Sequence, residues 1–299
     1  MNKKYKNVII IGAGKIAYSI IPALQISGFV IRSIISRKID SAKSLAVKTG
    51  TRHYTNKLNE INIDNGIVFL CVPDNQIKTV AEELSRLKLV FGNFIFVHLS
   101  GAQDISCLNS LKKKKGLTAS LHIMQTFPSK RRISIKGCYS AVETGSKEAE
   151  KILFNLAMAV ALKPFRLKSN AKVFYHLAGV FASNFLAGNL YSAGAVFNKT
   201  GNNNIDFFEL ISPIISSTLS NIKKSGSVNA LSGPVERGDI QTIKTHLSVL
   251  KKDSLKTNNK SLLLSYIAQS LNLLEVAEKK HGGSDEIYKL IRELLIKTL

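Results

Sequence analysis

The chain has 299 residues, with 42 Lys and Arg against 20 Asp and Glu, which gives a formal net charge of +22. Hydrophobic residues make up 45% and charged residues 21%, so intrinsic disorder is excluded as the main description, and the length favours two domains over one. The three cysteines share no metal-ligand spacing, so neither a disulfide scaffold nor a thiolate zinc site is indicated.

The excess of basic residues raises the question of nucleic-acid binding. The one dense run, 112–115, precedes Gly116 where a helix would end, and lysines there complement the helix dipole. The chain has no tryptophan and no interleaved aromatic and basic residues for base stacking. We therefore expect no nucleic-acid partner and keep RNA binding by the basic surface only as a third hypothesis.

No targeting or membrane segment is expected. The apolar run 8–11 follows three lysines but stops at Gly12, short of the roughly 7 to 15 residues of a signal peptide. The longest candidate for a membrane span, 173–197, contains His176 and two asparagines. With the cysteine pattern, this predicts a cytoplasmic protein without membrane contact.

The first half of the chain alternates short β-branched runs with helical patterns. In chain order, we predict strands at 8–11, 29–35, 67–72, 94–99, 118–123, 140–143 and 164–167, and helices at 15–27, 41–50, 75–87 and from 147 onward. These strands are too apolar to have one face exposed to solvent. The pattern therefore predicts an α/β fold with a parallel sheet covered on both sides.

The second half, after Ser169, contains no convincing strand pattern. We predict helices at 171–197, 205–224 with an interruption at Pro213, 240–250, 261–280 and 285–299, with a polar loop at 251–260. The first helix is rich in Ala, Gly and Ser, which indicates close contact with another helix or a partner subunit. The predicted domains are 1–167, which binds the cofactor, and 168–299, all-helical, for substrate binding and dimerisation.

A glycine motif follows the first strand and opens the first helix, as the sequence Gly12-Ala13-Gly14-Lys15-Ile16-Ala17. Gly12 permits the tight turn, Gly14 lets a pyrophosphate approach the backbone, and Ala17 lets the helix pack against the sheet. The free N–H groups of the turn and the helix dipole hold the anion. Strand, motif, helix and second strand in this order predict dinucleotide binding by Gly12, Gly14, Lys15 and Ile16.

The end of the second strand distinguishes between the two nicotinamide cofactors. An NAD site usually has an acidic residue about 20 residues beyond the motif, to bind the ribose hydroxyls. Here Ser36, Arg37 and Lys38 occupy this region, with no carboxylate before Asp40. A hydroxyl group and two cations suit a 2′-phosphate, so we predict NADP(H) held by Ser36 and Arg37.

Several short motifs in this order resemble a bacterial family that joins a Rossmann-like NADP-binding domain to a helical C-terminal domain of unknown function. They are Gly12-Ala13-Gly14, Cys71-Val72-Pro73-Asp74, Val97-His98-Leu99-Ser100-Gly101-Ala102, Leu121-His122 with Phe127, Tyr175-His176 with Asn184, and Gly233-Pro234 with Arg237-Gly238-Asp239. The family resembles the superfamily of ketopantoate reductase, pyrroline-5-carboxylate reductase, 6-phosphogluconate and other β-hydroxyacid dehydrogenases and deazaflavin-dependent NADP oxidoreductases. The resemblance covers nearly the whole chain.

The resemblance implies a C-terminal domain like that of 6-phosphogluconate dehydrogenase, and cofactor contacts from Val72, Pro73 and Ser100. In the β-hydroxyacid dehydrogenases, a lysine followed four residues later by an asparagine begins the corresponding helix, and the lysine donates a proton to the substrate oxygen. Lys172 keeps this position, but His176 replaces the asparagine. Either residue is therefore the candidate acid, since histidine titrates near neutral pH.

Three more residues are predicted to bind substrate. His122 ends a strand at the edge where open α/β sheets bind ligands, Asn184 follows His176 near the same helix face, and Arg237 precedes a helix and suits a substrate carboxylate. His98, His122 and His176 lack ligand spacing, so no metal is expected.

The leading hypothesis is an NADPH-dependent reductase of a small 2-oxo or imino acid, with ketopantoate or a related acid as the first substrate and a homodimer as the assembly. The alternative is a non-catalytic NADP(H)-binding sensor or scaffold.

Overall fold

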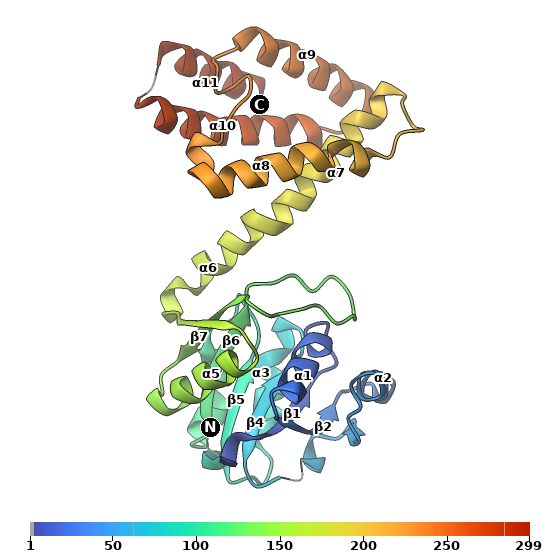
Figure 1. Cartoon of the computed structure of the whole chain (residues 1–299), viewed down its shortest axis with the longest axis vertical. Coiled ribbons are helices and arrows are strands. Elements are labelled where there is room, and N and C mark those ends of the chain that lie inside the picture. The colour runs from blue at the N-terminus through green and yellow to red at the C-terminus, as the bar shows by residue number, and fades with distance from the viewer. Residues whose placement is uncertain (1–2, 62, 284) are drawn as a thin grey trace. The chain divides into compact units, whose positions relative to one another are not determined.

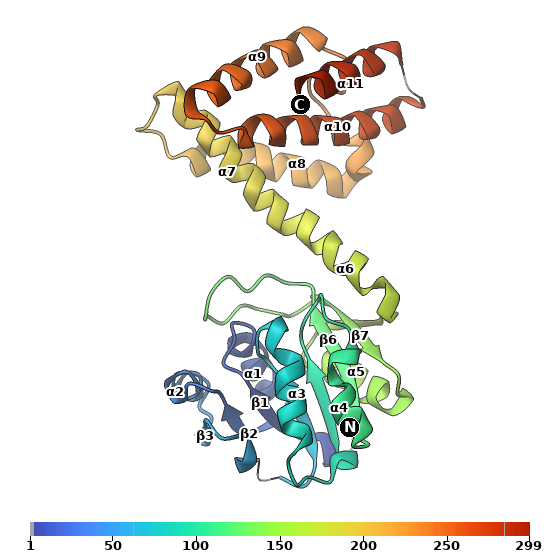
Figure 2. The same cartoon turned by 180° about the vertical axis from the view of Figure 1, so that it is seen from behind.

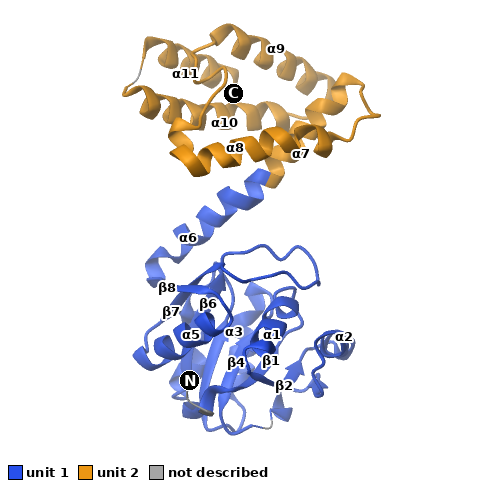
Figure 3. Cartoon of the chain, in the orientation of Figure 1, with its two compact units in different colours: residues 1–186 blue, residues 187–299 orange. Residues whose placement is uncertain are grey.

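The structure is a computed structural model that describes residues 3–61, 63–283 and 285–299. The chain divides into two compact units, residues 1–186 and 187–299 (Figure 3). The boundary predicted at 167/168 lies between the last strand, which ends at Arg166, and the helix that begins at Lys172. As a division by function, it stays a prediction.

The first unit is built on an eight-stranded sheet with the order β3-β2-β1-β4-β5-β6-β7-β8. The strands are β1 (Asn7–Ile11), β2 (Val30–Ile35), β3 (Tyr54–Thr55), β4 (Gly66–Leu70), β5 (Phe94–His98), β6 (Leu117–Ile123), β7 (Tyr139–Thr144) and β8 (Lys163–Arg166). Strand order reverses between β1 and β4, so the carboxyl ends of these two strands flank the crevice where such sheets bind ligands.

Helices cover both faces of this sheet (Figures 1 and 2). One face packs against α1 (Ala17–Ile26), α2 (Ile39–Thr49) and α5 (Lys147–Ala159), and the other against α3 (Ile77–Ser85) and α4 (Asn109–Lys113). Residues of β1 alternate between the two cores: Ile10 packs on the α1 side and Ile9 on the α3 side. Because helices cover both faces, the central strands β1, β4 and β5 are buried and largely apolar, and the predicted Rossmann-like α/β class is confirmed.

One strand pair departs from the predicted parallel sheet. β6 and β7 are antiparallel, with Leu121 opposite Val142. The reason is their connection, residues 124–138, which contains no helix or strand and returns the chain directly, whereas a parallel pair needs a crossover that is usually helical. The connection passes over α1 (Figure 1).

The helices after β8 are α6 (Lys172–Gly179), a π-helical turn at Val180–Asn184, α7 (Phe185–Phe197), α8 (Phe207–Asn229), α9 (Ile240–Thr257), α10 (Ser261–His281) and α11 (Glu286–Thr298). The core of the second unit is formed by α9, α10 and α11, through residues such as Ile243, Ile267 and Ile291. No strand follows β8 in the described residues, as predicted.

Two predicted breaks in the helices are wrong. α8 continues through Pro213 and kinks instead at Gly226, where φ is +79°. The carbonyl group that Pro213 leaves without a donor belongs to Glu209, which is exposed, so no buried polar group is left without a partner there. The polar segment expected as a loop at 251–260 is largely helical, because α9 runs to Thr257 and lysine is a good helix former on an exposed face.

Candidate functional site

The glycine motif between β1 and α1 is held against the end of β4. A Cβ on Gly12, whose φ is +101°, would lie 2.5 Å from the carbonyl oxygen of Cys71, and a Cβ on Gly14 would lie at the same distance. Such contacts are prohibitive, because the neighbour is backbone that cannot move aside. Both glycines are therefore required to bring the loop close to β4, so in this structure Gly14 has a packing role beyond the predicted cofactor approach.

The N-terminus of α1 has no side-chain cap. Ile16 occupies the N-cap position without a capping hydrogen bond, and the helix begins at Ala17. The N–H groups of Ala17 and Ser19 donate to the carbonyl oxygens of Gly14 and Ile16, and the positive end of the helix dipole at this terminus is suited to an anion. Gly14, Lys15 and Ile16 line a cavity beside this helix end.

An outer cavity of about 780 Å³ extends from the glycine motif to the end of β2. It is lined by Gly12 and Gly14 at one end and by Ser36, Arg37 and Lys38 at the other. Arg37 Nη1 lies 3.4 Å from Gln76 Oε1, which orients the guanidinium group only weakly. The site supplies a hydroxyl group and two cations at the position where a ribose 2′-phosphate needs them, so these residues fit NADP(H).

An inner cavity of about 470 Å³ continues from Val72 and Pro73 to Ser100, Gly101 and His122. Ser100 fixes its floor, because the Ser100 hydroxyl donates to Asp74 Oδ2 at 2.7 Å and accepts from the N–H groups of Ala102 and Gln103. The nine residues predicted to bind the cofactor line these two cavities. Their contacts with NADP(H) stay predictions.

Two histidines converge at Gly101, which lines the inner cavity together with His122. A Cβ on Gly101 would lie 2.7 Å from both His122 Nε2 and His176 Nδ1, so these nitrogens approach one point above the Gly101 backbone. The two rings are edge to face, with their centroids 6.3 Å apart. Tyr175 binds the other ring nitrogen of His122: the Tyr175 hydroxyl group lies 3.1 Å from His122 Nδ1. The absence of a side chain at Gly101 therefore lets both imidazole nitrogens approach its backbone.

The environment keeps His122 neutral. Burial, and then the positive charges of His176 and Lys172, lower the pKa of His122 to about 4. Burial also raises the pKa of Tyr175 to about 12, so its hydroxyl group keeps its proton. His122 is thus a hydrogen-bonding group at neutral pH. His176, in contrast, is exposed on α6.

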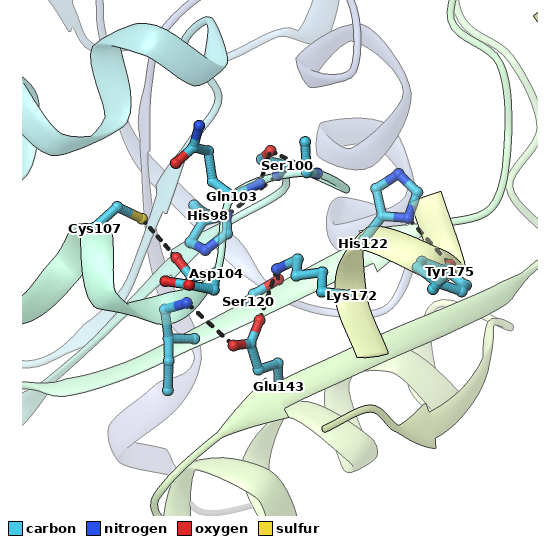
Figure 4. A network of polar contacts seen from close by, with 12 residues as sticks. His98, Ser100, Gln103, Asp104, Cys107, Ser120, His122, Glu143, Lys172 and Tyr175 are labelled. Atoms are coloured by element: carbon cyan, nitrogen blue, oxygen red, sulfur yellow. Dashed lines mark hydrogen bonds and ion pairs between the residues drawn. The ribbon is translucent and has the colours of Figure 1, made fainter. Parts of the chain in front are cut away.

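Lys172 forms a buried ion pair with Glu143 (Figure 4). Its side chain is 2% exposed, and Nζ lies 2.8 Å from Glu143 Oε2 on β7 and also donates to Ser120 on β6. Glu143 Oε1 accepts from the backbone N–H of Ile105. Burial lowers the pKa of Lys172, while Glu143 acts in the opposite direction. The ammonium group points into the sheet, and Lys172 does not line either cavity.

His98, at the end of β5, contributes a pH dependence to stability. It is 0% exposed, and burial, followed by the charge of Lys172, lowers its pKa from 6.5 to about 3. Between these values, the unfolded chain binds a proton that the folded chain does not, so stability decreases as the pH falls. We expect the urea midpoint to fall from pH 7 to pH 4, and to fall less steeply in His98→Asn.

The control for this titration is His246→Asn, because His246 is exposed on α9. This variant should leave the dependence of the urea midpoint on pH unchanged. Equal slopes in His98→Asn and the unmodified protein would contradict the assignment of this titration to His98.

The remaining predicted substrate residues are not among those that line these two cavities. Asn184 ends the π-helical turn and is exposed. Arg237 is exposed in the second unit, two residues before Asp239, whose carboxylate caps α9 by accepting from the N–H of Thr242. The substrate roles of Asn184 and Arg237 stay predictions.

Sequence reasoning missed Glu143 and Lys130. Glu143 is the one carboxylate in an otherwise uncharged strand whose neighbours are buried, and such a position signals a buried partner of opposite charge. Lys130 lies in the connection after β6 and lines both cavities. Its local signal is the basic run 130–132, which does not show which of the three residues reaches the cavities.

Two family models match separate parts of the chain. Residues 7–90 match the family "NADP oxidoreductase coenzyme F420-dependent", and residues 138–272 match a domain of unknown function, DUF2520. The first match spans β1, the glycine motif and the end of β2, which are the elements that form the outer cavity. The chain is an NADP-dependent oxidoreductase.

Solved structures with the same fold support this assignment. A Bacteroides fragilis protein assigned to the NADP oxidoreductases is 25% identical, with a TM-score of 0.72 over 88% of this chain and 97% of its own. A Thermotoga maritima protein is 28% identical, with a TM-score of 0.67 over 92% and 99%. No curated protein sequence matches the oxidoreductase.

The reductive aminase of Aspergillus terreus, solved with NADPH and ethyl-5-oxohexanoate, shares the fold at 16% identity, with a TM-score of 0.56 over 98% and 93%. Within the described residues, no helix of the oxidoreductase has both the length and the apolar character to cross a membrane.

Proposed function

We propose that the enzyme reduces the C=O or C=N bond of a small 2-oxo or imino acid, with a ketopantoate-type acid as the first substrate to test. Bound NADPH supplies the hydride to the substrate carbon. The protein must then deliver one proton to the substrate oxygen or nitrogen, so that an alcohol or an amine forms together with NADP⁺. The convergence of His122 Nε2 and His176 Nδ1 above Gly101 is the observation that carries this proposal.

The two histidines have different roles in this proposal. His122 is neutral at pH 7 and is held by Tyr175, so it orients the substrate by a hydrogen bond. His176 is exposed, and its Nδ1 approaches the same point as His122 Nε2, so it donates the proton. Lys172 is already paired with Glu143, which favours His176 over Lys172 as the acid. We propose that Asn184 and Arg237 bind the substrate carboxylate.

A direct assay tests the function. NADPH oxidation is followed by absorbance against a panel of 2-oxo acids, including ketopantoate, and cyclic imino acids. We expect turnover with at least one member of the panel. Tight NADPH binding without oxidation of any member would instead support the alternative, a non-catalytic sensor or scaffold.

We also propose that the enzyme is a homodimer that functions in the cytoplasm. Neither α7 nor α8 has a buried residue, and α6 buries only Lys172. Large apolar side chains are exposed along these helices, including Phe174, Phe181, Phe185, Tyr191, Phe208 and Ile214. A second copy would cover this surface, and sedimentation at micromolar concentration should show twice the chain mass. The free cysteines are consistent with a reducing compartment.

A further inference from the structure

The outer and inner cavities meet at a narrow set of shared residues. Those lining both are Gly14, Cys71, Val72, Pro73 and Lys130. A dinucleotide cofactor has two nucleotide halves joined by a pyrophosphate. With the adenosine half beside Arg37 and the nicotinamide half toward Gly101, the pyrophosphate must cross at the shared residues. Lys130 is the one charged residue among them.

Lys130 reaches this position from an anchored segment. It belongs to the connection 124–138 between β6 and β7. Three residues further on, the N–H of Ile133 donates to Ser19 Oγ of α1 at 2.9 Å, and Ser19 is 2% exposed. Ile135 is 3% exposed and packs in the core on the α1 side of the sheet. The segment is thus fixed to the same helix whose N-terminus faces the pyrophosphate position.

The charge of Lys130 has no partner within the part of the chain that the structure describes, because no carboxylate lies within 4.0 Å of its ammonium group. The glycine motif offers its N–H groups, the dipole of α1 and the charge of Lys15, which lines the inner cavity only, to the two charges of a pyrophosphate. We propose that Lys130 is a cofactor-binding residue that contacts the pyrophosphate as a point charge where the two cavities meet. This inference rests on NADP(H) binding and not on the identity of the substrate.

The test compares two cofactors. Because the chain has no tryptophan, the fluorescence of NADPH or NADH reports binding without protein interference. NADPH and NADH share the pyrophosphate and differ in the 2′-phosphate. We expect Lys130→Met to raise the Kd of both by the same factor, about 10-fold to 100-fold, and to weaken the salt dependence of binding. Arg37→Ala should raise the Kd of NADPH alone.

The matched control is Lys136→Met, because Lys136 is exposed on the same connection and lines neither cavity. It removes the same charge from the protein and should leave both Kd values unchanged. An unchanged Kd in Lys130→Met, or a loss confined to NADPH, would overturn the proposal. These measurements need no turnover. They therefore test the role of Lys130 even if the proposed reductase activity is wrong.

Discussion

Replacing His176 by alanine should lower kcat by about 10²-fold to 10⁴-fold while the Kd of NADPH stays within about twofold. The reason is that His176 Nδ1 faces the space above Gly101 but His176 is not among the residues lining either cavity. Losing it removes the proposed proton donor without removing a predicted cofactor contact. The measurement is NADPH oxidation with the substrate found in the panel, together with a fluorescence titration of NADPH.

Two comparisons make this result specific to proton donation. Imidazole added to His176→Ala should restore part of the turnover, because a free imidazole fits the space that the side chain leaves. His53→Ala is the matched control, since His53 lies on the other side of β1 next to Ser33 and should keep full activity. A His176→Ala enzyme with unchanged kcat would refute the assignment.

Replacing Lys172 by methionine should destabilise the first unit by about 3–5 kcal/mol. The change leaves the Glu143 carboxylate, which is 2% exposed, with only the N–H of Ile105 and no opposite charge. An unpaired charge in the interior costs more than the pair itself contributed. Urea unfolding followed by circular dichroism measures the loss.

A second replacement tests the cause of this destabilisation. In the double variant Lys172→Met/Glu143→Gln, the amide oxygen still accepts from Ile105 and no charge is buried, so most of the stability should return. Lys168→Met is the control at an exposed position, with an expected change within about 0.5 kcal/mol. If Lys172→Met were stable yet inactive, Lys172 would be the proton donor and the ion pair would have no structural role.

The cofactor half of the enzyme was predictable because its signals are local. The glycine motif, the strand before it and the helix after it are consecutive, and the basic residues at 36–38 follow the next strand directly. Because β1 and β2 are parallel, the residues that follow each strand lie at the same edge of the sheet. Local patterns also gave two wrong predictions. Pro213 and the polar run 251–260 were each predicted to interrupt a helix, but Pro213 and most of this run lie on exposed helices, where polar groups can reach solvent.

The catalytic end was less predictable because its residues meet across long separations. Spacing places Lys172 and His176 on one face of α6, yet it does not show that β6 and β7 offer Ser120 and Glu143 to the lysine. The sequence pointed to both as candidate acids. Burial separates them, because Lys172 faces carboxylate and hydroxyl groups inside the sheet while His176 faces Gly101.

The sequence by itself determined the Rossmann-like α/β class, the helical second half and the preference for NADP(H), since each depends on residues within one βαβ unit or one helix. Only the tertiary structure decided which polar groups share a site. The antiparallel turn-back from β6 to β7 brings Glu143 to Lys172 and Lys130 to the glycine motif. Such contacts depend on the order of the strands in the sheet and on where a loop is anchored. Neither can be inferred from the periodicity of hydrophobic residues in the sequence.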